Sequence, residues 1–401
     1  MYQKTNSETW YFIAYLVLCF SIFRGIRLPS AWTYTHFLFN YDFGFSKRGL
    51  IGEVYSWSNT FAFSRELFYL FSALIFIANI LLIYSLVKEL IDSKNPIFIG
   101  ISLVFISSLA IVFLSHIIGY FDHVGLLVTL VSLKVVGFYK KIIFLSIFFS
   151  LALLVHEVNL ILFFPVIFMS LLLSSNKLDF WKFTTLICFS VFTISIGLVM
   201  SHSLISEDNA QNMYIDLSSK ISHTALREDA FDVLHKNIED NILSTKENVW
   251  ADEKIIEKQV LSLLVTMPIF LFFIYYTVTS LVKLNIQRYI ILLAILASLS
   301  PLLLHLVAWD IHRWNTFTIT TSFLIFFVVF QSRLKSKDFV VTKTHSIQPI
   351  VIFWVFFNGT AYIPLFDGYD VSNFPFDYII ELIQNEKGFS TPYLIEDTCD
   401  D

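Results

Sequence analysis

The sequence predicts an all-α, polytopic membrane protein with about eleven transmembrane helices. Three observations support this: 56% of the residues are apolar and only 15% are charged, apolar runs of spanning length recur along the chain, and lysines and arginines fall mostly on one side of those runs. Soluble domains contain about 45–50% apolar and about 25% charged residues. The composition therefore excludes a soluble enzyme and a disordered chain, and the net charge of −5 leaves no basic surface for nucleic acid.

Each predicted span is an apolar run of about 20 residues, the length that crosses the hydrocarbon core. The run 142–175 is too long for one crossing, and His156-Glu157 interrupts it. Basic residues flank both ends of this run, so we expect two short helices that meet at His156-Glu157. The spans are near 10–28, 66–87, 96–115, 121–138, 142–175 (two), 182–200, 260–282, 289–307, 316–330 and 347–366.

The orientation follows from the basic residues of the short loops, which are enriched on the cytoplasmic side. With the N-terminus cytoplasmic, the inner loops contain Lys88, Lys94, Lys140, Lys141, Lys177, Lys182, Lys283, Arg288, Arg333, Lys335, Lys337 and Lys343. The acidic C-terminal tail, from Asp367 onward, then lies outside. The first outer loop departs from this rule, because it is rich in arginine and lysine and so needs a local reason such as anion binding.

Three regions follow from this pattern: a transmembrane core over 1–200, a polar outer segment over 201–258, and further spans with the acidic tail over 259–401. In the outer segment, Phe231, Leu234, Ile238 and Ile242 are close to helical spacing, which predicts one amphipathic helix. Such a helix would pack on the membrane surface or cover a cavity. The three cysteines are scattered, so neither a disulfide framework nor a thiolate zinc site is indicated.

The first outer loop contains Asp42, Lys47, Arg48 and Glu53 among three glycines. From Leu50 its apolar pattern suits a short helix lying in the membrane interface, with Lys47 and Arg48 near the N-terminal end of that helix. Arginine matches phosphate oxygens in a bidentate way. We therefore expect Lys47 and Arg48 to bind a lipid-linked phosphate or diphosphate; the alternative is ordinary pairing with lipid headgroups.

The second outer turn places Asp122 and His123 at the edge of a span that has no other acid. An ionisable residue at that depth faces protein or a watery cavity. Asp122 with a histidine would supply a general base or metal ligands. The alternative for Asp122 is an N-cap, since aspartate before an apolar run commonly caps a helix.

His156 and Glu157 stand where the long apolar run breaks. A carboxylate beside an imidazole tunes proton transfer near neutral pH. The alternative is a structural pair that fastens two short helices. Because Pro165 and the short predicted helices indicate irregular backbone around a cavity, we favour the functional interpretation.

The last candidate site contains Asp310, His312 and Arg313, with Asp310 and Arg313 spaced to lie on one helical face. Arg313 supplies a second cation on the outer side, although the pair Asp310–Arg313 would also serve as a purely structural bridge. All four sites map to the outer ends of spans, while the inner loops carry ordinary lysines. Ionisable residues are energetically costly to place in a membrane, so their gathering at one leaflet predicts a water-accessible, membrane-embedded site there.

The layout of Asp42 in a first outer loop that continues as an interfacial helix, with Asp122 in the next outer turn, resembles the GT-C superfamily of integral-membrane glycosyltransferases. The phenylalanine- and isoleucine-rich composition, the eleven spans and the long outer segment also resemble O-antigen polymerases of the Wzy type. The resemblance to the GT-C superfamily implies an enzyme that uses a polyprenyl-phosphate-linked sugar. The resemblance to Wzy implies an enzyme that joins polyprenyl-diphosphate-linked repeat units at the periplasmic face. Asp122 departs from the GT-C pattern because its neighbour is a histidine instead of a second acid.

These interpretations together predict a multi-pass glycosyltransferase of the bacterial inner membrane that polymerises undecaprenyl-diphosphate-linked repeat units. The catalytic candidates are Asp42, Asp122, His156 and Glu157; Lys47, Arg48 and Arg313 would bind diphosphate, with Glu53, His123, Asp310 and His312 in support. The expected partners are the lipid-linked glycans, membrane lipids and a chain-length regulator. A divalent metal stays open as a cofactor. The alternatives are a GT-C transferase of one sugar, an acyltransferase with a histidine base, and a flippase, which would carry charges mid-span and two related halves.

Overall fold

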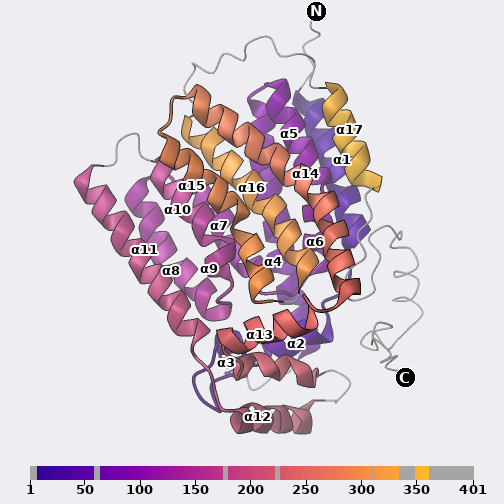
Figure 1. The fold of residues 1–401 in the computed structure, drawn as a ribbon, viewed down its shortest axis with the longest axis vertical. Coiled ribbons are helices and arrows are strands. Elements are labelled where there is room, and N and C mark those ends of the chain that lie inside the picture. Colours follow the sequence, from indigo (N-terminus) through magenta and orange to yellow (C-terminus); the bar gives the residue numbers. More distant parts are fainter. Residues whose placement is uncertain are drawn as a thin grey trace, which may run out of the picture.

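The fold is a bundle of helices, drawn in Figure 1 from a computed structural model that describes residues 7–57, 64–174, 179–221, 226–308, 310–333 and 348–360. Within these ranges the regular structure is helical and no strand occurs. The helices are α1 (Ser7–Gly25), α2 (Ala31–Phe37), α3 (Gly49–Ser56), α4 (Arg65–Asp92), α5 (Pro96–Ser107), α6 (Leu109–His116), α7 (Asp122–Lys134), α8 (Phe138–Val155), α9 (Asn159–Leu162), α10 (Phe164–Ser174), α11 (Phe180–Ser201), α12 (Glu207–Lys220), η2 (Glu228–Leu234), α13 (Ile238–Asn248), α14 (Glu253–Lys283), α15 (Arg288–Leu299), η3 (Ser300–Leu306), α16 (Ile311–Arg333) and α17 (Gln348–Thr360).

Seven helical stretches in the described part of the chain are long and apolar enough to cross a membrane. They are Arg65–Asp92, Pro96–His116, Phe138–Val155, Phe180–Ser201, Glu253–Lys283, Arg288–Leu306 and Ile311–Ser332. The stretch Asn159–Ser174 is apolar but shorter. Three further predicted spans, near 10–28, 121–138 and 347–366, overlap the helices α1, α7 and α17 in that order. For the last of these spans, the structure describes only residues 348–360.

Two stretches form the centre of the bundle, because their apolar windows are buried on nearly all sides. These are Pro96–His116, 94% buried, and α16, 89% buried, whereas α4 and α11 are only 33% buried. Phe105 of α5 stacks face to face on Phe323 of α16 with ring centroids 3.7 Å apart. The exposed apolar faces of α4 and α11 are suited to contact lipid.

The long apolar run 142–175 is broken at His156-Glu157, as predicted. Helix α8 ends at Val155, and α9 begins at Asn159. The side-chain amide of Asn159 donates to the Ala152 carbonyl of α8 over 2.9 Å. Figure 1 shows α8 descending to the end of the bundle that carries α12 and α13, and α10 returning toward the opposite end. His156 and Glu157 therefore lie at this lower end, with the outer segment.

The predicted amphipathic helix of the outer segment proved to be two elements. Phe231 and Leu234 are buried in the 3-10 helix η2, while Ile238 and Ile242 belong to α13 and are exposed. The first element ends at Leu234, with His235 as its C-cap, and Asn237 starts the second, because its side chain and that of Asp240 form a reciprocal capping box. The single-helix prediction was wrong because spacing alone does not reveal a cap between the apolar pairs.

Candidate functional site

The first outer loop is shaped by two glycines that let α3 pack against the preceding chain. A Cβ on Gly49 would lie 2.4 Å from the Tyr41 ring, and one on Gly52 would lie 2.0 Å from the Phe39 carbonyl oxygen. Arg48 immediately precedes this helix and has a φ of 67°, in the left-handed region. A left-handed backbone costs a non-glycine residue of the order of 1 kcal/mol or more, and it persists only where the surrounding packing holds it. The packing of α3 therefore fixes the position of the Arg48 Cα–Cβ bond.

The outer segment is fastened to this loop through Lys47. The Lys47 N–H donates to the Ser203 carbonyl over 2.9 Å, and its ammonium donates to the Lys236 carbonyl over 3.0 Å. The amide of Asn209 adds a 3.1 Å bond to the Phe43 carbonyl. Burial lowers the pKa of the Lys47 ammonium, and the nearby Glu157 charge opposes this shift. The segment 201–258 therefore covers the loop that carries Arg48.

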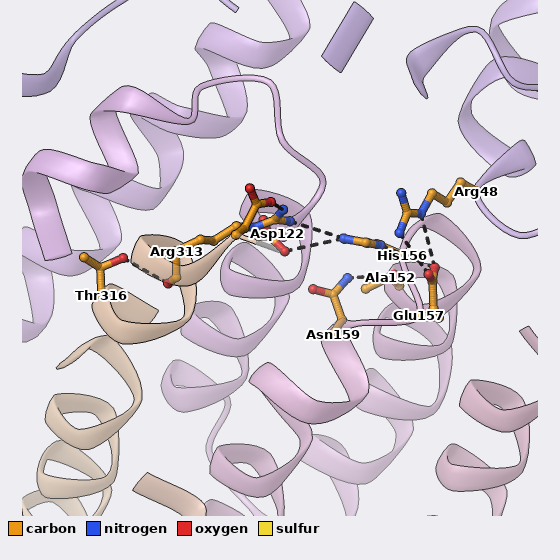
Figure 2. A network of polar contacts seen from close by, with 9 residues as sticks. Arg48, Asp122, Ala152, His156, Glu157, Asn159, Arg313 and Thr316 are labelled. Carbon is orange, nitrogen blue, oxygen red and sulfur yellow. Dashed lines mark hydrogen bonds and ion pairs between the residues drawn. The ribbon is translucent and has the colours of Figure 1, made fainter. Parts of the chain in front are cut away.

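Arg48 pairs with Glu157, 109 residues further along the chain (Figure 2). Its Nη2 lies 3.0 Å from Oε1 and its Nε lies 3.4 Å from Oε2 of that carboxylate. The same carboxylate oxygen, Oε2, is 3.3 Å from Nδ1 of His156. A residue of the first outer loop and two residues of the helix break thus form one polar cluster.

The cluster continues from His156 to Asp122 and Arg313. Nε2 of His156 lies 3.6 Å from Oδ1 of Asp122 and 3.4 Å from Nη2 of Arg313. The other Asp122 oxygen, Oδ2, accepts a hydrogen bond from Arg313, and the Asp122 side chain is fully buried. Asp122 makes no side-chain cap to α7, in which it is the first residue, so the N-cap alternative was wrong.

Arg313 is held by two carboxylates and two aromatic rings. Besides Asp122 it binds Asp310 through a 2.7 Å bond, which confirms the predicted pairing of Asp310 with Arg313. Its guanidinium carbon lies 4.8 Å from the Tyr120 ring centroid and 4.6 Å from that of Trp314. We call Arg48, Glu157, His156, Asp122, Arg313 and Asp310 together the polar network.

The partners of His156 assign its tautomer. Glu157 is an acceptor only, so Nδ1 carries the proton, and Nε2 then accepts from Arg313. Burial, reinforced by the Arg48 charge, lowers the pKa of His156, although both carboxylates oppose this. Burial alone would raise the pKa of Glu157, but Arg48 and then His156 outweigh it and hold that pKa well below its usual value.

A glycine brings the helix break close to Asp122. Gly125 is one turn after Asp122 in α7, and a Cβ there would lie 2.1 Å from Oδ1 of Asn159. The amide of Asn159 is held in turn by the Ala152 carbonyl of α8. Because no side chain at position 125 separates them, α7 and α9 approach closely enough for His156 to face Asp122.

Other predicted site residues lie outside the polar network. Asp42 is exposed in the loop, where its N–H donates to the side chain of Asn40. Glu53 accepts from the Tyr41 N–H and from the Trp57 indole, so it fastens the loop to α3.

The two predicted histidines beside the network are buried. His123 points toward α4, where the amide of Asn79 bonds its carbonyl and ring. His312 precedes Arg313 on α16. The structure thus unites Arg48, Asp122, His156, Glu157, Asp310 and Arg313, and leaves Asp42, Glu53 and His123 with other partners.

His36 of α2 is a residue that the sequence reasoning missed. Its ring packs against Trp32 and Phe39 at centroid distances of 4.8 and 5.1 Å, and its Nε2 is buried without a hydrogen-bond partner among the described residues. Burial, with the charge of Arg48 next, lowers the pKa of His36 well below its usual value. No acid neighbours it in sequence, so only the fold reveals that it lies within range of the polar network.

Among the described residues, no group of three or more histidine, cysteine, aspartate or glutamate side chains is arranged to hold a metal ion. No family model matches the chain, and neither a curated protein nor a solved structure matches it significantly.

Proposed function

We propose that this chain is an integral-membrane glycosyltransferase that acts on undecaprenyl-diphosphate-linked glycans at the periplasmic face of a bacterial inner membrane, and that it polymerises repeat units. The proposal includes eleven spans, a cytoplasmic N-terminus and a periplasmic C-terminus. One observation carries it: the polar network joins ionisable residues from four separate connections at one end of an otherwise apolar bundle.

Glycosyl transfer from a diphosphate needs an anion site and a base. The acceptor hydroxyl attacks the anomeric carbon, the bond to the diphosphate breaks with its electron pair on the leaving oxygen, and the hydroxyl proton passes to a base. In our proposal Arg48, with the charge of Lys47 nearby, binds the diphosphate, and the Glu157–His156 pair takes the proton. Arg313 orients Asp122 instead of binding substrate, since two carboxylates already occupy its guanidinium.

The test is complementation of a deletion strain with Arg48→Ala at unchanged protein level. We expect loss of polymer, and normal chain lengths would contradict the proposal. Arg227→Ala is the matched control, because Arg227 is an arginine of the segment 201–258 that pairs with Asp229, and both side chains are about half exposed. That variant should give polymer of normal length.

The lipid-linked material that accumulates separates the alternatives. A polymerase defect leaves complete repeat units on the periplasmic leaflet, whereas a defective single-sugar transferase leaves units short of one sugar. A defective flippase leaves complete units on the cytoplasmic leaflet. Only the first outcome agrees with the function proposed.

A further inference from the structure

We infer that Glu157 is the internal occupant of the anion site on Arg48, that a phosphate group of the lipid-linked substrate displaces it, and that the released carboxylate then accepts the proton of the acceptor hydroxyl. This inference rests on the proposed function and deepens it. Glu157 closes the anion site on Arg48, and the arrival of the phosphate opens it.

The pair Arg48–Glu157 is an accessible part of the polar network. Their side chains are 13% and 14% exposed, compared with 0% for Asp122 and 5% for His156. An anion that arrives from the outer side can therefore reach the guanidinium of Arg48 while the inner pairs stay dry.

The carboxylate of Glu157 occupies the same edge of the guanidinium that a phosphate would use. It lies against Nε and Nη2 of Arg48, with its two oxygens on two donors. Arginine presents this fork equally to carboxylates and phosphates. A phosphate carries a larger charge and more acceptor oxygens, and the charge of Lys47 acts at the same place, so exchange favours the phosphate.

The buried pair that Arg313 forms with Asp122 opposes the same exchange at this arginine. Arg313 binds Asp122 and Asp310 and is packed against the rings of Tyr120 and Trp314. Removing Asp122 from it would leave a fully buried carboxylate without its cation, which is strongly unfavourable. Arg48 is therefore the exchangeable cation and Arg313 the fixed one.

Exchange changes what Glu157 does. Bound to Arg48 it is a poor base, because the cation stabilises its charged form. Once the phosphate takes Arg48, Glu157 stays beside His156 in a buried position, where burial raises its proton affinity. The hydroxyl proton then goes to Glu157, the diphosphate leaves with the electron pair of the broken bond, and Glu157 returns to Arg48 after losing the proton to water.

The experiment measures phosphate binding to the full-length protein in nanodiscs by titration calorimetry. Inorganic pyrophosphate and farnesyl diphosphate are the two probes, and nanodiscs with or without phosphatidylglycerol test ordinary headgroups. Glu157→Gln removes the competing charge while keeping the shape, so we expect it to bind both diphosphates at least about tenfold more tightly than the wild type. Arg48→Ala should lose binding, and Arg227→Ala should bind as the wild type does.

The protons taken up on binding give a second measure, obtained in two buffers of different ionisation enthalpy at pH 6. The wild type should take up more protons than Glu157→Gln when diphosphate binds, because the ionisation of the probe itself contributes to both. Glu157→Asp, which is too short to keep the pair with Arg48, should also bind more tightly, and it replaces the glutamine variant if that variant does not fold.

Equal or weaker binding by these variants, or equal proton uptake, would overturn the inference. Binding of farnesyl diphosphate without binding of pyrophosphate would identify a lipid-attached phosphate as the ligand of Arg48. Loss of diphosphate binding in nanodiscs that contain phosphatidylglycerol would overturn the inference, because ordinary headgroups would then occupy the site. Failure of the proposed function is separate: it appears as normal polymer in the Arg48→Ala strain, whatever the calorimetry gives.

Discussion

Asp122 and Arg313 lie 191 residues apart in sequence and form a buried ion pair between the start of α7 and the first turn of α16. The pair connects the central helix of the bundle to the outer turn that also faces His156. The Asp122 side chain is fully buried and that of Arg313 is 9% exposed, so the two charges depend on one another for compensation.

Removing one partner of this pair should therefore be worse than removing both. We expect Arg313→Met to lower the free energy of unfolding by about 3–5 kcal/mol, because Asp122 keeps a buried charge without a cation. The double variant with Asp122→Asn should regain most of that loss. Thermal unfolding of the purified protein in detergent checks this, and equal melting temperatures of single and double variants would refute the coupling.

Gly52→Ala should disable the protein by moving Arg48. The added Cβ would lie 2.0 Å from the Phe39 carbonyl oxygen, which is backbone and cannot rotate away, so α3 must shift. We expect loss of diphosphate binding and of polymer. Gly359→Ala is the control, since nothing lies within 4 Å of its added Cβ, and it should behave as the wild type; equal behaviour of both variants would contradict the role assigned to α3.

Stability should fall in mild acid, in part because of His36. Its pKa in the folded protein is well below the usual 6.5, so below that pH the unfolded chain binds the extra proton and folding becomes less favourable. The contribution is fully present above pH 6.5 and is lost as the pH falls toward the folded value. His36→Phe keeps an aromatic ring against Trp32 and Phe39, and the drop in melting temperature from pH 7 to pH 5 should be smaller in this variant. An unchanged drop would argue against His36 as a contributor.

The orientation predicts where reporter fusions become active. Fusions at positions 140, 178 and 285 should all report the cytoplasm, because each lies in or beside a pair of basic residues of a short connection. A periplasmic signal at position 178 alone would mean that 142–175 crosses once, and it would reverse every later side assignment.

Sequence reasoning found the apolar helices and the members of the polar network because both leave local signals. Hydropathy marks the helices, and an acid or arginine beside an apolar run is costly enough to stand out. The break at His156-Glu157 was predictable because the run was too long for one crossing.

Partner choice was not predictable, because it depends on close approaches that only the fold creates. Asp42 was a catalytic candidate like Asp122, and Glu53 a supporting one, yet Glu53 binds the Tyr41 N–H and Asp42 is exposed. His36 has no charged neighbour in sequence and enters range of Arg48 through the packing of α2. Gly125 gave no signal at all, since its role is to leave room for Asn159.

The long separations within the polar network have a consequence for biosynthesis. Arg48 is synthesised 109 residues before Glu157, and Asp122 is synthesised 191 residues before Arg313, so neither pair can form until its later partner has been made. The site is completed only when α16, one of the last helices made, is inserted. A chain truncated before α16 would lack Arg313 and would leave Asp122 without the cation that compensates its charge in the folded protein.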